Sequence, residues 1–597
     1  MTNRRVRLAV VSAVGVALTG AVSGGVSGAR LHAQAVTTPC PAPTSALPLT
    51  FSGPPTTAAI TACDLMTRLY KFADDSMGGR KIGTSDHERA TAYLAAEAKR
   101  LGLEPAGENG TYFQNLPLIS RALDTTGTMV VGSTTLRAGT DYLVSTTATR
   151  AGDGAGWQLV YGGSLLDTTI TMFPVPATGT VVLFRPIAPG ADGSAIQKTA
   201  KGKSWVAWYN SIKNRASLST TPALSATSVR TAVNPTATIL LVNESAPLAL
   251  TLTPAAAHTL FGGPLDGVAA GTPSKSFTLA LRFIDTPRID RNVIARLPGT
   301  DPKLRGQYVA LGAHSDHVGT ARAAVDHDSV RAAHMGARSG TEGAASRRQT
   351  TEDDEYDRIK VLTDSLHNLR PIRRDSVNNG ADDGGSGSVA LLEIAESFAR
   401  GAAGAKPKRS VLFIWHTNTE SAPTLSGSSW FLEHPTVPRD SIAAEINVDM
   451  IGRGEKTDEV GITMTDEDPR YGNPDFVEVI GSRRRSNELT PLIERANVDA
   501  KLGLKLDYAA DAEGHPEGLV CRNDQASYAR YGIPVAFFTT GYHADFRELT
   551  DEPQYVRYSH LERIVKLAAS TSLALANVDH RLSADTPAPD PKAACKP

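Results

Sequence analysis

The sequence predicts an α/β protein with a mixed, mostly parallel central sheet flanked by helices, and with an additional β-rich inserted domain. Two observations predict this fold class. From Asn292 onward, short buried-strand patterns alternate with amphipathic helical patterns, as they do when helices cover both faces of a sheet. Between residues 119 and 280, short Val/Thr/Leu runs are broken by Gly, Pro and Asp, which is typical of a separate β-rich module.

Composition limits the classes of partner. The chain has 597 residues, enough for roughly two to four domains, and a net charge of −1 with 21% charged residues. These values do not point to nucleic acid or to an anionic membrane surface. Beyond the N-terminal segment, no apolar run approaches the ~18 residues of a membrane span. We therefore expect no nucleic-acid partner and no membrane association of the mature form.

The first residues have the pattern of an export signal. Arg4, Arg5 and Arg7 precede a short apolar run, and Ala33-Gln34-Ala35 fits an A-x-A cleavage site. We predict a signal peptide at residues 1–35 and an exported protein, either periplasmic or extracellular. An uncleaved start-anchor is the alternative, although the run is short and Gly-rich for a membrane span.

The four cysteines fit structural roles better than metal binding. Their spacing matches no zinc knuckle and no C-x-x-C motif. In an oxidising compartment, Cys40 and Cys63 could close a loop and Cys521 could reach Cys595 in the tail. Unpaired cysteines without a role remain the alternative.

The elements follow in order along the chain. A helix is expected in SDHERATAYLAAEAKRLGL, with Ser85 or Asp86 as its cap and Gly102 at its end. In the β-rich module, strands are expected in GWQLVYGG, GTVVLFRP, SWVAWYN and TATILLVN. Further on, we expect strands in QYVALGAH, RSVLFIWH, EINVDMIG and IPVAFFTTG, and helices in SVALLEIAESFARGA and YSHLERIVKLAASTSLALAN. A long charged insertion between His317 and Asn378 contains one more helical pattern, TEDDEYDRIKVLTDSLHNL.

Polar residues follow most of the predicted strands, where ligands of open α/β sheets bind. They form five groups: His314, Asp316 and His317; Asp382 and Asp383; His416 and Glu420; Asp449; and His543, Asp545, Arg547 and Asp551. Each has a simpler interpretation alone, such as a hydrogen-bonded core histidine or a helix cap. Five groups together favour zinc, which takes His nitrogen and carboxylate oxygen, with a nearby carboxylate as general base. The sequence has no G-x-S-x-G, H-E-x-x-H or G-x-x-x-x-G-K-[ST] motif to support a competing mechanism.

The runs NVIARLPGTDPKLRGQYVALGAHSDHVG, NNGADDGGSGSVALLEIAESF, INVDMIGR and YGIPVAFFTTGYHADF resemble the dizinc exopeptidase family of bacterial leucyl aminopeptidase and aminopeptidase Y. The resemblance spans residues 64–118 and 292–577, and the segment between them resembles the protease-associated domain often inserted in these enzymes. It implies a zinc-exopeptidase (phosphorylase/hydrolase-like) fold. The expected parts after the signal peptide are the N-terminal part of the peptidase domain (36–118), the protease-associated-like domain (119–280), the zinc peptidase domain (281–580) with a possible lid at 318–378, and a disordered tail (581–597).

The resemblance also implies roles for individual residues. One zinc would be held by His314, by Asp383 as the bridging carboxylate, and by Asp449. Asp316 matches the acid that orients the metal-binding histidine. Glu420 matches the first member of an E-E pair, which serves as the general base.

The sequence departs from the family pattern at the second zinc. Ser421 stands where the pair would supply a ligand, although counting back from Gly427-Ser428 shifts the pair to Ser421 and Ala422, so one inserted residue is required. Gln525 stands where the family usually has a His.

Arg547 stands in place of the family's late histidine ligand. Arginine cannot ligate zinc, but it carries a fixed charge and pairs with carboxylates. We hypothesise that Arg547 replaces the second zinc electrostatically by pairing with Asp383 or a neighbour. The alternative is a degenerate site in which Arg547 points to solvent.

The resemblance implies an exported metallo-exopeptidase-like hydrolase of the aminopeptidase type, which acts on the N-termini of peptides or proteins. Zinc-activated water would attack the peptide carbonyl with Glu420 as general base, and one zinc is expected where the family pattern has two. Two alternatives stay open. The chain could be a non-catalytic relative that binds peptide or a partner, or a zinc hydrolase with a different substrate.

Overall fold

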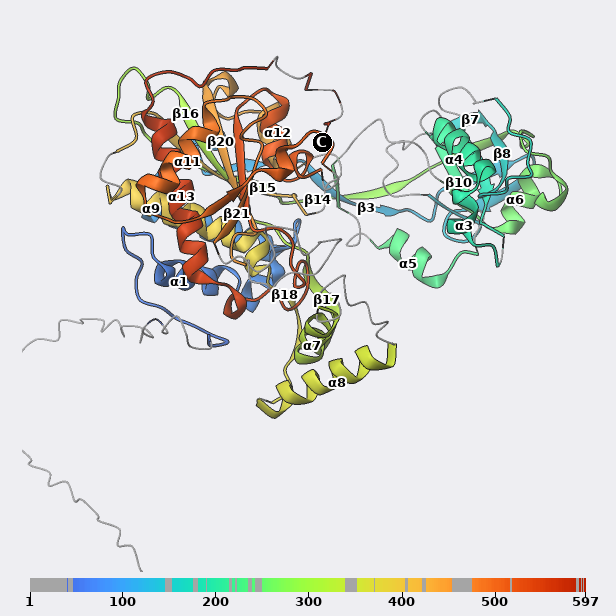
Figure 1. Cartoon of the computed structure of the whole chain (residues 1–597). Coiled ribbons are helices and arrows are strands. Elements are labelled where there is room, and N and C mark those ends of the chain that lie inside the picture. Colours follow the sequence, from blue (N-terminus) through green and yellow to red (C-terminus); the bar gives the residue numbers. More distant parts are fainter. Residues whose placement is uncertain are drawn as a thin grey trace, which may run out of the picture.

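The computed structural model describes residues 40, 47–144, 153–174, 181–188, 190–213, 217–220, 223–234, 239–241, 250–338, 352–369, 371–402, 406–420, 426–453, 475–515, 518–586, 590–591, 593 and 595–596. Figure 1 shows a main body, a lobe carried at the end of the β3–β14 ribbon, and an arm made of α7 and α8. The predicted signal peptide lies outside the described residues. Among the helices that are described, none combines the length and apolar character needed to span a bilayer.

The central sheet of the main body is mixed and mostly parallel, which confirms the predicted fold class. Its middle strands β19, β16, β20 and β23 run parallel, and antiparallel pairs occur toward its edges. The strand order is β1 (Glu104–Pro105), β15 (Arg291–Leu297), β19 (Ser410–His416), β16 (Tyr308–His314), β20 (Ile442–Val448), β23 (Val535–Thr539), β21 (Phe476–Ile480) and β22 (Lys505–Asp507), with β2 (Phe113–Asn115) beside β15.

Helices cover both faces of this sheet because successive strand residues point to opposite sides. Val309 and Leu311 of β16 belong to one core cluster and Ala310, between them, to another. The first face packs against α1 (Ala62–Phe72), α2 (Ser85–Arg100), α9 (Gly387–Ala399), α11 (Leu489–Asp499) and α13 (Tyr558–Asn577), and the second against α10 (Gly427–Glu433) and α12 (Gln525–Arg530). The prediction for the cap of α2 was wrong by one residue, since the side chain of Thr84 accepts from the amide of His87.

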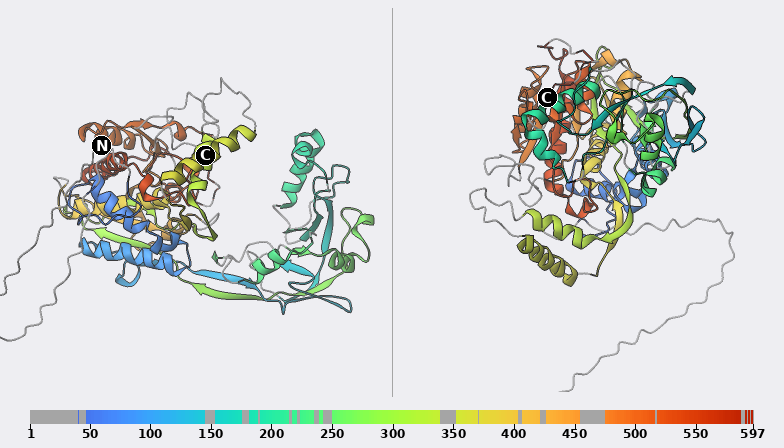
Figure 2. Two further views of the ribbon diagram at one scale, coloured as in Figure 1. Left: turned by 90° about the horizontal axis from the view of Figure 1, so that it is seen from below. Right: turned by 90° about the vertical axis from the view of Figure 1, so that its right-hand side faces the viewer.

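The lobe contains two sheets. One has the order β6 (Tyr142–Val144), β12 (Leu250–Leu252), β10 (Ser217–Thr220), β9 (Val181–Arg185), β8 (Leu159–Ser164), and the other β5 (Thr134–Arg137), β4 (Thr128–Val131), β13 (Phe277–Ala280), β7 (Asp153–Trp157). Both join the main body through β3 (Leu118–Leu123) and β14 (Phe283–Arg288), which pair with each other and extend away from the main body (Figure 2). The other edge of β3 pairs with β11 (Ile239–Leu241). Helices α3 (Gly193–Lys198), α5 (Ala226–Val233) and α6 (Pro254–Phe261) complete the lobe.

One expected strand of the lobe is a helix. The run SWVAWYN lies inside α4 (Ala200–Lys213), not in a strand. Trp205, Trp208 and Tyr209 have the i, i+3, i+4 spacing of one helix face and surround the ring of Phe184. The aromatic residues therefore mark the face of a helix that packs on β9, and the prediction misread their spacing as strand alternation.

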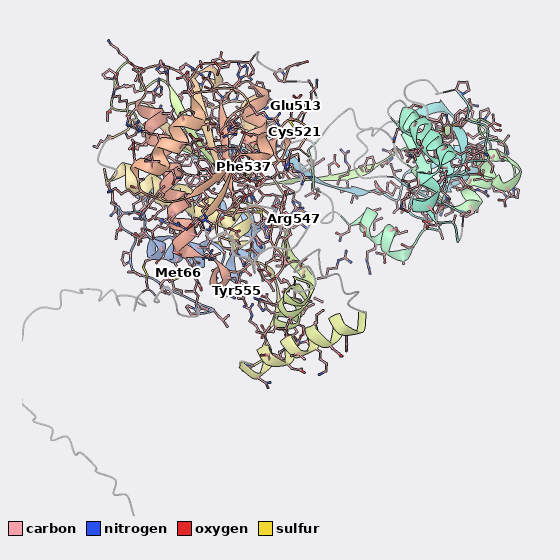
Figure 3. All side chains as sticks on the ribbon, in the orientation of Figure 1. Met66, Glu513, Cys521, Phe537, Arg547 and Tyr555 are labelled. Atoms are coloured by element: carbon pink, nitrogen blue, oxygen red, sulfur yellow. A yellow bond between two sulfur atoms is a disulfide. The ribbon has the colours of Figure 1, made fainter. Side chains whose placement is uncertain are left out.

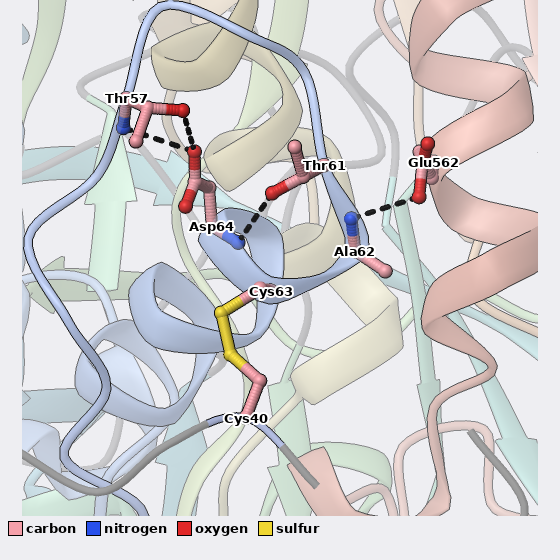
Figure 4. Close-up of a disulfide and its surroundings, with 7 residues drawn as sticks. All are labelled: Cys40, Thr57, Thr61, Ala62, Cys63, Asp64 and Glu562. Carbon is pink, nitrogen blue, oxygen red and sulfur yellow. Dashed lines mark hydrogen bonds between the residues drawn. A yellow bond between two sulfur atoms is a disulfide. The ribbon is translucent and has the colours of Figure 1, made fainter. Parts of the chain in front are cut away.

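Two disulfides fix the ends of the main body. Cys40 bonds to Cys63 at the start of α1, and Cys521 bonds to Cys595. These are the pairings that the sequence suggested. Figure 4 shows the first of them beside the N-terminus of α1, where the side chain of Thr61 accepts from the amide of Asp64.

The charged insertion forms the arm. Its base is a pair of antiparallel strands, β17 (Gly319–Asp326) and β18 (Arg374–Asn378), and beyond them stand α7 (His327–Arg338) and α8 (Glu352–Leu369). The helix predicted in TEDDEYDRIKVLTDSLHNL is α8. In Figure 1 the arm projects from the side of the main body, below the ribbon that leads to the lobe.

Candidate functional site

The polar residues after the parallel strands meet at one edge of the sheet. His314 ends β16 directly beside His416, which ends β19, and Asp449 follows β20. Asp383 arrives from the turn before α9. This close approach requires Gly384, because its φ is +71° and a Cβ there would lie 2.7 Å from the ring of His314.

Four of these residues form a group that we call the strand-end cluster: His314, Asp383, Glu420 and Asp449. The Nε2 of His314 lies 3.2 Å from Oδ1 of Asp383 and 3.1 Å from Oδ1 of Asp449. Ligand atoms of His314, Asp383 and Glu420 lie within 4.8 Å of one another. The side chains of His314 and Asp383 are each 1% exposed. One imidazole nitrogen and several carboxylate oxygens therefore converge on a buried point.

Asp316 supports the strand-end cluster through two different groups. Its main-chain carbonyl lies 3.1 Å from Nδ1 of His314, while its carboxylate is 3.6 Å from the same nitrogen. With Nδ1 donating to that carbonyl, a neutral imidazole directs the lone pair of Nε2 at the carboxylates of the cluster. The carboxylate of Asp316 instead accepts from the amides of Thr419 and Glu420, both at 3.3 Å. Asp316 thus holds both the histidine and the segment that carries Glu420.

The protonation equilibria of the cluster reflect its excess of acids. Burial and the charge of Asp383 raise the pKa of Glu420 well above its ordinary value. Burial opposes ionisation of Asp383, but hydrogen bonding and charge from His314 lower its pKa. Burial also lowers the pKa of His314, yet Asp449 and the other carboxylates raise it well above the usual range. The raised pKa values of Glu420 and His314 mean that these two groups favour an added positive charge, while Asp383 stays ionised beside His314.

Arg547 forms an ion pair with Glu420. Its Nη2 lies 2.5 Å from Oε2 of Glu420 and 3.4 Å from the main-chain oxygen of the same residue. The side chain of Arg547 is 46% exposed, whereas that of Glu420 is 4% exposed. The sequence predicted Asp383 or a neighbouring acid as the partner of Arg547, and the structure shows the neighbouring acid Glu420. Ser421 lies outside the described residues. In the view of Figure 3, Arg547 stands near the edge of the main body from which β3 and β14 leave.

The loop of Arg547 is anchored on the arm. The carboxylate of Asp545 accepts from Arg331 of α7 at 2.9 Å and lies 3.2 Å from Nη2 of Arg453. Glu552 lies 2.9 Å from Nε2 of His327, the first residue of α7. Buried ion pairs therefore fix this loop against the base of the insertion.

The same loop also holds the turn that presents Asp383. The carboxylate of Asp551 accepts from the amides of Asp382 and Asp383, each at 3.0 Å. His543 lies 3.2 Å from the carboxylate of Asp382, close enough for an ion pair. Among the described residues, His543 and Asp382 belong to no group that could hold a metal.

Three further polar side chains lie next to the strand-end cluster. His317 lies 3.7 Å from Asp383, and burial lowers the pKa of His317 to about 4, so it is neutral. His416 contacts the hydroxyl of Tyr528 at 3.1 Å. Gln525 donates to the carbonyl of Leu519 at 3.2 Å. None of these three side chains joins the strand-end cluster.

Two contributing residues were missed by the sequence reasoning. Asn523 donates from Nδ2 to Oδ2 of Asp449 at 2.6 Å, and a polar residue just before α12 is a signal that could have found it. The fully buried Arg80 donates to the carbonyls of Ser315 at 3.0 Å and Gly380 at 2.8 Å. Arg80 is 235 residues from Ser315 in a segment without strand or helix pattern, so no local signal indicates it.

One comparison is with models of protein families, and it matches part of the chain. Residues 363–572 match the model of Peptidase family M28. The stretch that matches Peptidase family M28 includes Asp383, Glu420, Asp449 and Arg547, and it begins after His314. No curated protein matches the chain.

Several solved structures align along most of the chain. An aminopeptidase from Aneurinibacillus sp. strain AM-1 aligns at 14% identity and TM-score 0.42, covering 88% of this chain and 96% of its own. A zinc aminopeptidase from Bacillus subtilis aligns at 13% identity and TM-score 0.41, covering 86% of this chain and 95% of its own. A Peptidase M28 precursor from Shewanella amazonensis aligns at 15% identity and TM-score 0.37, covering 88% of this chain and 98% of its own.

Proposed function

We propose that the protein is an exported metallo-exopeptidase-like hydrolase of the aminopeptidase type, which removes residues from the N-termini of peptides or proteins. The observation that carries this proposal is the strand-end cluster itself. One imidazole nitrogen and three carboxylates meet at the carboxyl edge of a buried parallel sheet. Three members of the cluster lie in the stretch that matches Peptidase family M28.

The donor set of the cluster suits zinc, which binds His nitrogen and Asp or Glu oxygen. In the proposal His314, Asp383 and Asp449 hold the ion. Oδ2 of Asp383 is buried without a hydrogen-bond partner among the described residues, so this oxygen is available to a cation. When bound, zinc polarises the scissile carbonyl and lowers the pKa of water.

In the proposed mechanism, Glu420 moves the proton. Its carboxylate takes a proton from the attacking water and passes it to the leaving amine. Its raised pKa suits a group that must take up a proton and then release it. Asp316 positions Glu420 by accepting from its amide. The same acid fixes His314 through its carbonyl, so one residue aligns the base with the metal-binding side chain.

Metal analysis combined with an aminoacyl-anilide assay tests the proposal. We expect about one zinc per chain and measurable turnover. Glu420→Gln should keep the zinc and lower kcat by about 10²–10⁴-fold. The matched control is Glu433→Gln, because Glu433 is an exposed glutamate at the end of α10. A purified protein with neither zinc nor turnover would refute the proposal, and two firm equivalents would show that the second-site assignment is wrong.

One observation favours a second candidate, a non-catalytic relative that keeps the fold and binds peptide. Glu420 is already paired with Arg547 at 2.5 Å, and a carboxylate oxygen held by a guanidinium is not open to a water molecule. In this case the protein would bind peptide without hydrolysing it, and Glu420→Gln would leave its behaviour unchanged.

A further inference from the structure

We propose that Arg547 makes the site select peptides that carry a carboxylate next to the scissile bond, and that this carboxylate draws Arg547 away from Glu420. The inference rests on the proposed function and names the substrate class of the same site. The carboxylate can be the C-terminus of a dipeptide or the side chain of an acidic second residue. Both present the same chemistry to a guanidinium.

The first argument is accessibility. Arg547 is 46% exposed, whereas two other arginines near the strand-end cluster are buried and committed. Arg80 is fully buried and donates to main-chain carbonyls. Arg453 is 1% exposed and pairs with Asp545. An incoming carboxylate therefore reaches Arg547, while neither buried arginine is open to it.

The second argument is the number of donors on the guanidinium. An arginine presents five N–H groups in a planar fork. Both contacts of Arg547 with Glu420 come from Nη2 alone. Nε and Nη1 can each donate a single charge-assisted hydrogen bond to an incoming carboxylate, whereas a bidentate pair would also need Nη2. A substrate carboxylate can thus begin to bind before the pair with Glu420 is broken.

The third argument is that Arg547 is held in place. Its backbone has φ +62°, a left-handed conformation that non-glycine residues rarely adopt without support from their surroundings. That support is visible two residues away, where Asp545 accepts from Arg331 and Thr550. The backbone that carries Arg547 is therefore anchored by contacts other than the pair with Glu420.

The consequence concerns substrate binding. With a neutral substrate, Arg547 keeps only its contact with Glu420. An acidic substrate adds a second carboxylate beside the guanidinium, so its binding gains an ion pair that the neutral substrate lacks. Binding, and through it kcat/KM, should therefore favour the acidic substrate.

The test compares three substrates on the zinc-loaded full chain: Leu-Gly, Leu-Gly amide and Leu-Asp amide. We expect kcat/KM about 10–100-fold higher for the two acidic peptides than for Leu-Gly amide, which is the worth of a charge-assisted pair. The first acidic peptide reports the terminal carboxylate and the second the side chain. Arg547→Gln should abolish the preference with zinc content unchanged, and Arg547→Lys should keep part of it. Arg522→Gln, at an exposed arginine in a neighbouring loop, is the control and should keep the preference in full.

Calorimetric binding of the same peptides to the Glu420→Gln protein separates the two proposals. No hydrolysis of any peptide by the unchanged chain would overturn the proposed function. Tighter binding of the acidic peptides, lost in Glu420→Gln/Arg547→Gln, would still support the role of Arg547. Equal affinities and equal kcat/KM for acidic and neutral peptides would overturn the inference, whether or not the protein is an enzyme.

Discussion

The two halves of the strand-end cluster are built differently. His314, Asp383 and Asp449 come from strand ends and a helix start, and their side chains are 1–7% exposed. Glu420 and Arg547 come from loops, and Arg547 is 46% exposed. The first half is fixed by the sheet, so its geometry follows from the fold. The second half is set by loop residues, which can replace a metal ligand by a charged side chain without disturbing the core.

The change with the largest expected effect disrupts the first half of the cluster, which His314, Asp383 and Asp449 form. Asp383→Asn removes the central carboxylate, so we expect zinc content to fall to near zero. Turnover should fall by more than the roughly 10–100-fold typical of losing an outer partner of a metal ligand. Metal analysis and the anilide assay measure both quantities. Asp382→Asn is the matched control, because its carboxylate faces His543 and should leave zinc bound. Zinc retained in Asp383→Asn but lost in Asp382→Asn would reverse the assignment of the two aspartates.

A change of intermediate effect tests the second half of the cluster, which Glu420 and Arg547 form. Ser421→Glu combined with Arg547→His restores a carboxylate and an imidazole at the positions that the family pattern gives to the second zinc. We expect the metal content to rise from about one to about two equivalents per chain. Each single change should stay near one equivalent, because each leaves the second ion short of a ligand. A double variant that still binds one equivalent would show that Glu420 and Ser421 are not in the assumed register.

The smallest expected effect concerns the anchor between the arm and the loop. Arg331→Met removes one partner of the buried Asp545, which keeps its pairs with Arg453 and Thr550. We expect the free energy of unfolding to fall by about 1–3 kcal/mol, as for loss of a hydrogen bond to a charged group. Urea unfolding measures it. Lys360→Met removes an exposed pair on α8 and should change stability by less than about 0.5 kcal/mol. Equal effects of the two changes would argue against the anchor.

The sequence was most informative where chemistry and strand ends coincide. His314 and Asp449 lie at strand ends and Asp383 before a helix, and the sheet edge brings these three together. Their role as zinc ligands was implied by the family resemblance and stays a prediction. The run SWVAWYN was misread because seven residues rich in aromatics fit both periods, and only the contact with Phe184 decides between them.

The supporting residues were harder to predict because their roles depend on tertiary contacts. Arg80 acts on carbonyls that are distant in sequence. Asp316 orients His314 through its main-chain carbonyl. Every residue type has this carbonyl, so the sequence does not reveal the contact. Predicting the partner of Arg547 required the path of the loop after β19. In the structure this partner is Glu420 and not Asp383. Local patterns specify which residues carry chemistry, while tertiary packing specifies which of them are paired.

The Cys521–Cys595 disulfide connects the oxidation state of the protein to the strand-end cluster. It joins two residues that are 74 positions apart. Cys521 lies two positions before Asn523, whose side-chain amide donates to Asp449. A polypeptide made in a reducing cytosol lacks this link, so the loop of Asn523 loses its tie to the C-terminal end of the chain. We therefore expect protein folded under oxidising conditions to hold zinc more tightly than the same polypeptide kept reduced, although no cysteine belongs to the strand-end cluster.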